Sequence, residues 1–179
     1  MPCSDNKSRF DHILIDLFLS AVAPSIVATD ANAGSGFVVA LGASQTAGKG
    51  LSRDQAFPAQ LETMLHAKGY DVRVVNEGIS GDTTSGMLNR LDQATPSGTK
   101  VVVLQPGGND WRKGGGADRT ANIAEIERRL RDRGIKIIML ENGTFRGLPK
   151  QPDGQHLTPE GYRAIAAHLL PQVTRALAR

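Results

Sequence analysis

Short apolar runs alternate along this chain with amphipathic segments, and no other feature of the sequence limits the fold as strongly. The runs are apolar at nearly every position, which is typical of strands buried on both faces of a sheet. They cover residues 37–41, 72–75, 101–104 and 135–140. Strands that alternate with helices require right-handed crossover connections. The sequence therefore predicts an α/β domain of three layers (α/β/α), in which a central parallel sheet of about four strands lies between helices.

The segments between these runs carry apolar residues at helical spacing. They predict helices over residues 55–68, 83–93 and 118–133, and a last helix that begins at Thr158. The sequence Thr158-Pro159-Glu160 combines a hydroxyl that can cap a helix, a proline suited to the first turn, and an acidic residue near the positive end of the helix dipole. His66 and His168 fall inside two of these helices without a matching motif. We interpret both as structural or solvated.

The bulk composition is that of one globular domain. A chain of 179 residues with 40% apolar and 22% charged residues can bury a substantial core, so disorder is not expected. The net charge is only +3 and no basic run is interleaved with aromatic residues, so we expect no nucleic-acid partner. Cys3 is the single cysteine, which excludes an internal disulfide, and the sequence has no metal-ligand motif. We therefore expect no metal and no other cofactor.

Residues 1–33 differ in kind from the rest of the chain. Lys7 and Arg9 precede an apolar segment over residues 13–28, and Ala31-Asn32-Ala33 places small residues at the −3 and −1 positions of a cleavage site. We interpret this pattern as a secretory signal peptide. The domain would then comprise residues 34–179 and be periplasmic or secreted.

One residue of the apolar segment argues against export. Asp16 places a charge inside it, and the alternative is an N-terminal amphipathic helix on a cytoplasmic protein. The segment is shorter than the roughly 20 apolar residues of a membrane-spanning helix, so we expect no stable membrane span. The sequence does not address the oligomeric state.

The residues best suited to take part in catalysis follow the ends of the predicted strands. Ser44 follows the first run after two small residues, Gly81 follows the second run, and Asn109 follows the third. Asp153 and His156 precede the last helix. Loops at the carboxyl ends of parallel strands gather at one edge of the sheet, so these residues are expected to share one cleft.

Their chemistry suits attack on a carbonyl group. A serine hydroxyl becomes a nucleophile only when a base takes its proton and a third group orients the base. Ser44, His156 and Asp153 are the candidates for these three roles. Negative charge then develops on the carbonyl oxygen and needs donors fixed in advance, which the backbone N–H groups of Ser44 and Gly81 and the side-chain amide of Asn109 could supply.

Four blocks of sequence together resemble those of the SGNH, or GDSL-type, hydrolases, a family that includes bacterial thioesterase I, lysophospholipase and arylesterase enzymes. The blocks are Gly42-Ala43-Ser44-Gln45, Ile79-Ser80-Gly81-Asp82, Gly107-Gly108-Asn109-Asp110 and Asp153-Gly154-Gln155-His156. The resemblance covers residues 37–178. It implies a flavodoxin-like fold and a hydrolase of ester bonds that works without a cofactor, through an acyl-Ser44 intermediate and with the oxyanion donors named above.

Two departures from the family pattern stand out. Ala43 replaces the usual Asp beside the nucleophile, and Gln45 replaces the frequent Leu; Asp82 or Asp110 could compensate for the missing carboxylate. The connection from the fourth strand to Asp153 is also short, where the family usually has a further helix and strand. This predicts a compact domain with a more open acyl site.

These residues predict a serine esterase that acts on small carboxylic esters or acyl thioesters. The sequence does not separate arylesterase, thioesterase and lysophospholipase activities, because substrate choice depends on pocket shape. A carbohydrate or peptidoglycan O-acetylesterase is the enzymatic alternative. A non-catalytic binding domain, disabled by Ala43, is the alternative from another class. Nucleotide binding is less favoured, because Gly48-Lys49-Gly50 lacks the first glycine and the Ser/Thr of a phosphate-binding loop.

Overall fold

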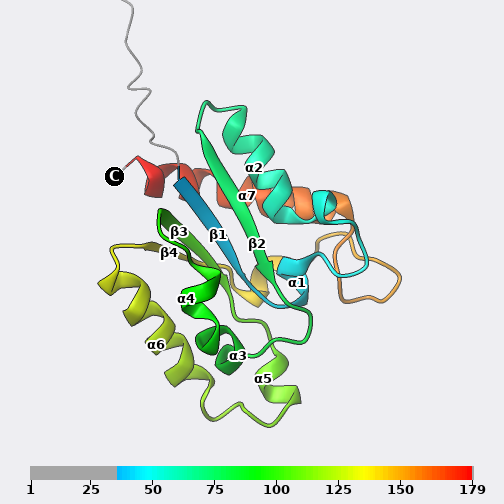
Figure 1. Ribbon diagram of the computed structural model, residues 1–179. Coiled ribbons are helices and arrows are strands. Elements are labelled where there is room, and N and C mark those ends of the chain that lie inside the picture. The colour runs from blue at the N-terminus through cyan, green and yellow to red at the C-terminus, as the bar shows by residue number, and fades with distance from the viewer. Residues whose placement is uncertain (1–35, 179) are drawn as a thin grey trace, which may run out of the picture.

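A four-stranded parallel sheet forms the centre of the molecule. The computed structural model describes residues 36–178 (Figure 1). Its strands are β1 (Gly36–Gly42), β2 (Val72–Gly78), β3 (Thr99–Gln105) and β4 (Lys136–Met139). They pair in the order β2-β1-β3-β4, and every pair is parallel. The predicted sheet is therefore confirmed, with β1 and β3 at its centre.

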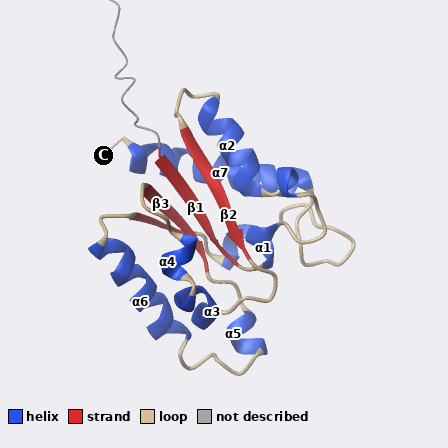
Figure 2. Ribbon diagram, in the orientation of Figure 1, coloured by secondary structure: helices blue, strands red, loops and turns tan. Residues whose placement is uncertain are grey.

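Helices cover both faces of this sheet. The helices are α1 (Ser44–Ala47), α2 (Phe57–His66), α3 (Thr84–Asn89), α4 (Leu91–Ala94), α5 (Asn109–Arg112), α6 (Arg119–Asp132) and α7 (Pro159–Leu177), with 3-10 turns η1 (Arg53–Gln55) and η2 (Asn142–Phe145). Figure 2 shows α2 and α7 on one side of the strands and α3, α4 and α6 on the other. This arrangement is the predicted three-layer α/β/α fold.

The side chains of β1 divide the core into two parts. Val38 and Ala40 face α2 and α7, whereas Val39 and Leu41 face α3, α4 and α6. All four are completely buried, as the unbroken apolar run predicts. Burial of each large apolar side chain contributes about 1.5–3 kcal/mol to the free energy of folding, so the contacts of this strand stabilise the packing of both helical layers on the sheet.

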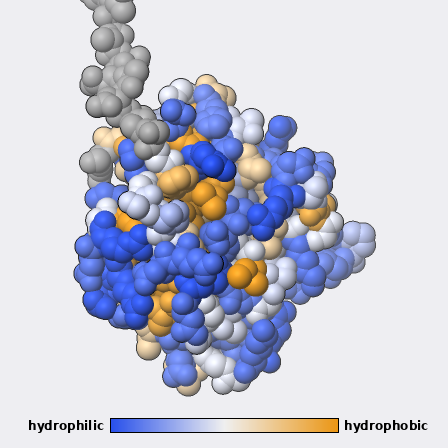
Figure 3. Space-filling model, viewed as in Figure 1, coloured by the Kyte–Doolittle hydropathy of each residue, from blue (hydrophilic) through white to orange (hydrophobic). Residues whose placement is uncertain are grey.

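The outer surface is mostly hydrophilic on the face seen in Figure 3. On α6, ion pairs at helical spacing join Arg128 and Arg129 to Glu125, and Arg131 to Glu127. Within the described residues, no helix is long and apolar enough to cross a membrane. The predicted signal peptide, residues 1–33, lies outside the described part of the chain.

Residues 83–93 form two helices instead of the single predicted one. The chain leaves the helical conformation at Arg90, with φ −104° and ψ 9°, between α3 and α4. The Arg90 side chain turns back to bind Asp82 and Glu77 at the end of β2. Helical spacing of apolar residues gives no sign of this interruption, because the contacts that Arg90 makes are polar.

The last helix begins as predicted. Thr158 caps α7 by accepting a hydrogen bond of 3.3 Å from the N–H of Gly161, and Pro159 occupies the first turn. Tyr162, Ile165 and Leu169 are buried against the sheet. The cap fixes where the chain enters α7, and therefore where the preceding loop with Asp153 and His156 lies.

Candidate active site

The predicted site residues lie where the strands end. In the sheet register, Gly42 of β1 is level with Gly78 of β2 and Gln105 of β3. The segments that follow carry Ser44 at the start of α1, the Gly81 loop and Asn109 at the start of α5, and Figure 1 shows α1, α5 and the loop before α7 at this arrowhead end of the strands. The alignment of the three strand ends brings residues from distant parts of the sequence to one edge.

Ser44, His156 and Asp153 form a continuous chain of hydrogen bonds. The Nε2 atom of His156 lies 3.0 Å from the Ser44 hydroxyl oxygen, and its Nδ1 atom lies 2.5 Å from a carboxylate oxygen of Asp153. His156 and Ser44 are buried, with exposed fractions of 3% and 9%. A carboxylate beside Nδ1 holds the ring proton there, so the unprotonated Nε2 can accept the serine proton.

Asp153 is held in place by the loop itself. Its Oδ1 atom accepts hydrogen bonds of 2.9 Å from the backbone N–H groups of Gln155 and His156, while Oδ2 contacts the imidazole. Gly154 has a φ of +66°, a conformation that glycine adopts without strain, and it allows the loop to fold back. The hydrogen bond with the His156 side chain and those from the backbone hold the pKa of Asp153 well below its usual value.

The turn before Ser44 is fixed by a buried amide at the end of β3. The Oε1 atom of Gln105 accepts a hydrogen bond from the Ala43 N–H and another from the Thr46 hydroxyl, both 3.2 Å. Ser44 is the first residue of α1, where a backbone N–H has no acceptor inside the helix. Sequence reasoning missed Gln105 because its position at the end of an apolar strand gives no sign of this partner.

The two acidic residues considered as substitutes for the missing family Asp support another loop. Asp82 pairs with Arg90 at 2.8 Å. The buried Asp110 accepts hydrogen bonds from the backbone and hydroxyl of Thr84, at 3.0 and 2.5 Å. Neither carboxylate forms a hydrogen bond with residues 43–45. The Ala43 N–H is instead satisfied by the neutral Gln105 amide.

Asn109 has one defined orientation. Its Nδ2 atom donates to the backbone carbonyl of Asp82 at 2.7 Å, and its Oδ1 atom accepts from Arg112 at 2.6 Å. Arginine only donates and a carbonyl only accepts, so the amide cannot be reversed without losing both contacts. One amide hydrogen of Nδ2 remains for a further acceptor. The neighbouring Gly81, with φ +83°, has its carbonyl bound by Lys113 at 2.7 Å.

A cleft of about 390 Å³ lies beside these groups. Ser44 and Asn109 line it, together with Ala43, Gln45, Gln105, Gly107, Gly108, Arg112, Asn142, Phe145 and Gln155. Gly81 is not among the lining residues, although Asp82 next to it contacts Asn109. Asn142 and Phe145 come from η2, so the short connection after β4 forms one wall of the cleft.

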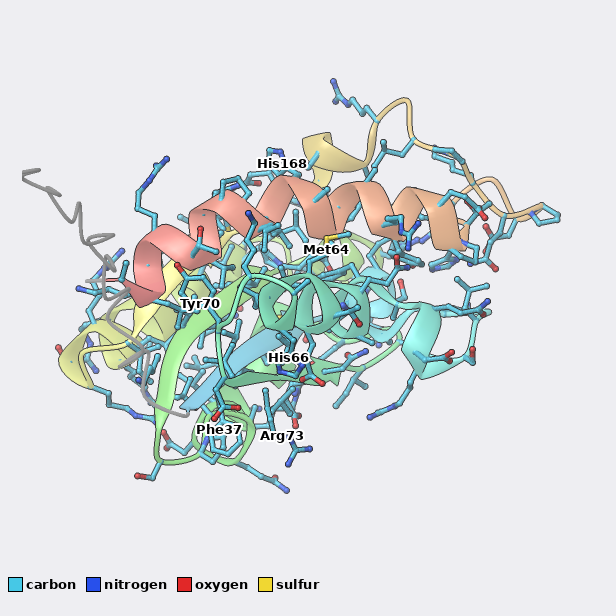
Figure 4. The ribbon with its side chains drawn as sticks, turned by 90° about the horizontal axis from the view of Figure 1, so that it is seen from above. Phe37, Met64, His66, Tyr70, Arg73 and His168 are labelled. Carbon is cyan, nitrogen blue, oxygen red and sulfur yellow. The ribbon has the colours of Figure 1, made fainter. Side chains whose placement is uncertain are left out.

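Two further histidines of the described residues, His66 and His168, lie away from Ser44. His66 contacts the backbone carbonyl of Val72 at 2.8 Å, at the start of β2, and His168 is exposed on the outer side of α7 (Figure 4). In residues 36–178, no group of three His, Cys, Asp or Glu side chains is arranged to hold a metal ion.

Comparison with known proteins finds a matching family and relatives that are named as esterases. Residues 40–178 match the GDSL-like lipase/acylhydrolase family. Esterase TesA of Pseudomonas aeruginosa is 36% identical over 126 residues, which cover 69% of this chain and 62% of TesA. The arylesterase of Vibrio mimicus is 33% identical over 109 residues, which cover 58% of this chain and 53% of that enzyme. The chain thus matches little more than half of the length of these relatives.

Solved structures have the same fold. The crystal structure of TesA aligns with a TM-score of 0.67 and 26% identity, covering 78% of this chain and 99% of TesA. The esterase EstA of Pseudoalteromonas aligns with a TM-score of 0.70 and 16% identity, over 80% of this chain and 99% of EstA, and so supports the fold alone. AlinE4, an esterase of the SGNH-hydrolase family, is 30% identical with a TM-score of 0.54, over 77% of this chain and 72% of AlinE4.

Proposed function

The chain belongs to the GDSL-like lipase/acylhydrolase family, and from this premise we propose that it is a serine hydrolase of small carboxylic esters or acyl thioesters. The observation that carries the proposal is the hydrogen-bonded chain from Ser44 through His156 to Asp153, beside an open cleft. Relatives named as an esterase and an arylesterase support ester bonds as the target.

In the proposed reaction, His156 accepts the hydroxyl proton of Ser44 while the serine oxygen attacks the carbonyl carbon. Asp153 keeps the ring oriented and stabilises its positive charge. His156 then gives the proton to the departing alcohol or thiol, which leaves an acyl group on Ser44. A water molecule activated by the same imidazole attacks this acyl-serine, and the carboxylic acid is released.

The oxyanion of the tetrahedral intermediate would be bound by donors on three loops. We assign the backbone N–H groups of Ser44 and Gly81 and the remaining amide hydrogen of Asn109 to this role. The hydrogen bond from Arg112 withdraws electron density from the Asn109 amide, which makes its N–H a stronger donor. Loss of one such donor lowers kcat by roughly 10²–10³-fold in serine proteases, and we expect an effect of that order for Asn109→Ala.

The test is the hydrolysis of p-nitrophenyl esters from acetyl to dodecanoyl by the wild type, Ser44→Ala and His156→Ala. The wild type is expected to turn over, and both variants are expected to fall by roughly 10³-fold or more. Ser52→Ala and His168→Ala remove the same side chains at exposed positions and serve as matched controls. Equal rates for wild type, Ser44→Ala and His156→Ala would contradict the proposal and favour a non-catalytic binding domain.

The chain-length profile also separates the finer activities. Amide side chains dominate the polar lining of the cleft and Phe145 is its one aromatic residue, which favours short acyl groups on polar alcohols. A carbohydrate or peptidoglycan O-acetylesterase is therefore a second candidate, and a strong preference for acetyl esters would support it. A preference for long acyl groups would favour thioesterase or lysophospholipase activity.

We also propose that the domain acts in the periplasm or outside the cell. The proposal depends on the sequence pattern of residues 1–33. Intact-mass measurement of protein recovered from the producing cells tests it. A chain that begins at Gly34 supports export, and a chain that retains its first residues contradicts it.

A further inference from the structure

We propose that the cleft beside Ser44 selects esters that carry a negative charge, and that Arg112 recognises this charge. The inference rests on the proposed ester hydrolysis and concerns its substrate class. Arg112 lines the cleft together with Ser44 and Asn109. It therefore lies at the reacting end of a bound ester rather than on a remote surface.

Arg112 has N–H groups that remain available to a ligand. Arg112 is exposed, and among the described residues its guanidinium donates one hydrogen bond, to Asn109 Oδ1, whereas a guanidinium carries five N–H groups. Within residues 36–178, no Asp or Glu forms an ion pair with it. A guanidinium in this state can bind a carboxylate with two parallel hydrogen bonds while it keeps its contact with Asn109.

The neighbouring basic residues increase the positive charge. Lys113 and Arg119 contact the backbone carbonyls of Gly81 and Gly107, and in the described part of the chain neither is paired with a carboxylate. These contacts hold backbone oxygens without neutralising the cations. Residues 112–119, which follow Asn109 in the chain, thus carry the three basic side chains of Arg112, Lys113 and Arg119.

The acidic residues of the same loops are occupied elsewhere. Asp82 is paired with Arg90, Asp110 is bound by Thr84, and Asp153 is bound by His156. None of the three lines the cleft, and its lining contains Arg112 but no Asp or Glu. An anionic substrate would therefore meet an attractive charge with no competing carboxylate on the cleft wall.

The rest of the lining suits a small polar substrate. Gln45, Gln105, Asn142 and Gln155 contribute uncharged amides to the wall, of which those of Gln45 and Gln105 are already hydrogen-bonded within the protein, and the volume of about 390 Å³ limits the size of the ligand. We infer an ester with a carboxylate close to the reacting carbonyl. The carboxylate can belong to the acyl group or to the alcohol, and two pairs of probes separate these cases.

The experiment compares kcat/KM for charged and neutral esters of similar size. For the acyl side, the pair is mono-p-nitrophenyl succinate and p-nitrophenyl pentanoate. For the alcohol side, it is p-acetoxybenzoate and its methyl ester. Each ester is assayed with the wild type, Arg112→Gln, Arg112→Lys and the control Arg175→Gln, and the rate with Ser44→Ala is subtracted as background. Arg175 is exposed in the last turn of α7, far from the cleft along the chain.

We expect the wild type to prefer the charged ester in one pair by roughly tenfold or more, since hydrogen bonds to charged groups are the stronger ones. Arg112→Gln should remove this preference, Arg112→Lys should keep part of it, and Arg175→Gln should keep all of it. Added salt should reduce the preference, because it screens exposed charges. An unchanged preference in Arg112→Gln, or equal losses for charged and neutral esters, would overturn the inference.

A binding measurement separates this inference from the proposed function. If the wild type hydrolyses none of the four esters, hydrolysis of small esters is contradicted but charge recognition can still be measured. Calorimetric titration of Ser44→Ala with each pair then decides. Tighter binding of the charged ester, lost in Ser44→Ala/Arg112→Gln, supports recognition by Arg112, and equal binding contradicts it.

Discussion

The Nε2 atom of Gln45 donates a hydrogen bond of 2.8 Å to the backbone carbonyl of Gln155. The residue that follows Ser44 is therefore tied to the residue that precedes His156. Tyr162 of α7 completes the link, since its hydroxyl donates to Gln45 Oε1 at 3.1 Å. Gln45 occupies the position where the family often has a leucine, which could not make these two contacts.

Gln45→Leu is expected to loosen the His156 loop and lower kcat/KM by roughly fivefold to tenfold, since misplacement of a catalytic group lowers its rate. It also leaves the buried Tyr162 hydroxyl without this acceptor, at a cost of about 1–3 kcal/mol in unfolding free energy. Steady-state kinetics and urea unfolding measure the two effects. Gln45→Leu/Tyr162→Phe should recover part of the stability but not the activity. Unchanged kinetics in Gln45→Leu would show that the link does not position His156.

Gln105→Leu is expected to destabilise the turn before Ser44. The substitution keeps the approximate size of the side chain but leaves the buried Ala43 N–H without its acceptor, which costs about 1–3 kcal/mol. Equilibrium unfolding in urea measures the loss. Gln151→Leu removes an amide from a less buried position and provides a comparison. An equal or smaller loss for Gln105→Leu than for Gln151→Leu would contradict the assigned role.

Arg90→Met is expected to destabilise the protein more than removal of a surface charge pair. Arg90 binds Asp82 and the backbone carbonyls of Glu77 and Gly42, so its loss leaves the mostly buried Asp82 carboxylate unpaired. The expected cost is about 3 kcal/mol. Arg128→Met breaks the exposed ion pairs of α6 and should change the stability little. Chemical unfolding of the two variants side by side checks the order, and equal losses would refute it.

Asp153→Asn is expected to change how stability depends on acid. The pKa of Asp153 is lowered in the folded protein from its ordinary value of 3.8, so its ionised form favours folding above that pH. This contribution is lost as the pH falls below 3.8 toward the folded-state pKa. The difference in unfolding free energy between wild type and Asp153→Asn should therefore be constant at neutral pH and shrink on acidification. A difference that stays the same across this range would contradict the hydrogen-bonded state of Asp153.

The parts of the fold that follow local patterns could be predicted. The run 37–41 is apolar at every position because β1 is covered on both faces, and Thr158-Pro159-Glu160 starts a helix because its side chains suit the first turn. The contact between Asp153 and His156 is also local, since a tight turn joins the two residues.

The supporting contacts could not be predicted in the same way. Gln105 binds the backbone of Ala43, 62 positions away, and Arg90 binds the carbonyl of Gly42, 48 positions away. Contacts between a side chain and a distant backbone group leave no periodic pattern in the sequence. The sequence shows that Arg112 is close to Asn109 along the chain. Whether its side chain lines the cleft depends on the direction that the chain takes from β3 into α5.

The separation of Ser44 and His156 has a consequence for how activity appears during folding. The two residues are 112 positions apart: Ser44 directly follows β1, whereas His156 lies in the loop between β4 and α7. Contacts between such distant segments close large loops and tend to form slowly. The pair can meet only when β1, β3 and α7 have docked together. Recovery of ester hydrolysis after dilution from denaturant would therefore time the completion of the fold, whereas recovery of helical signal would report its earlier, local steps.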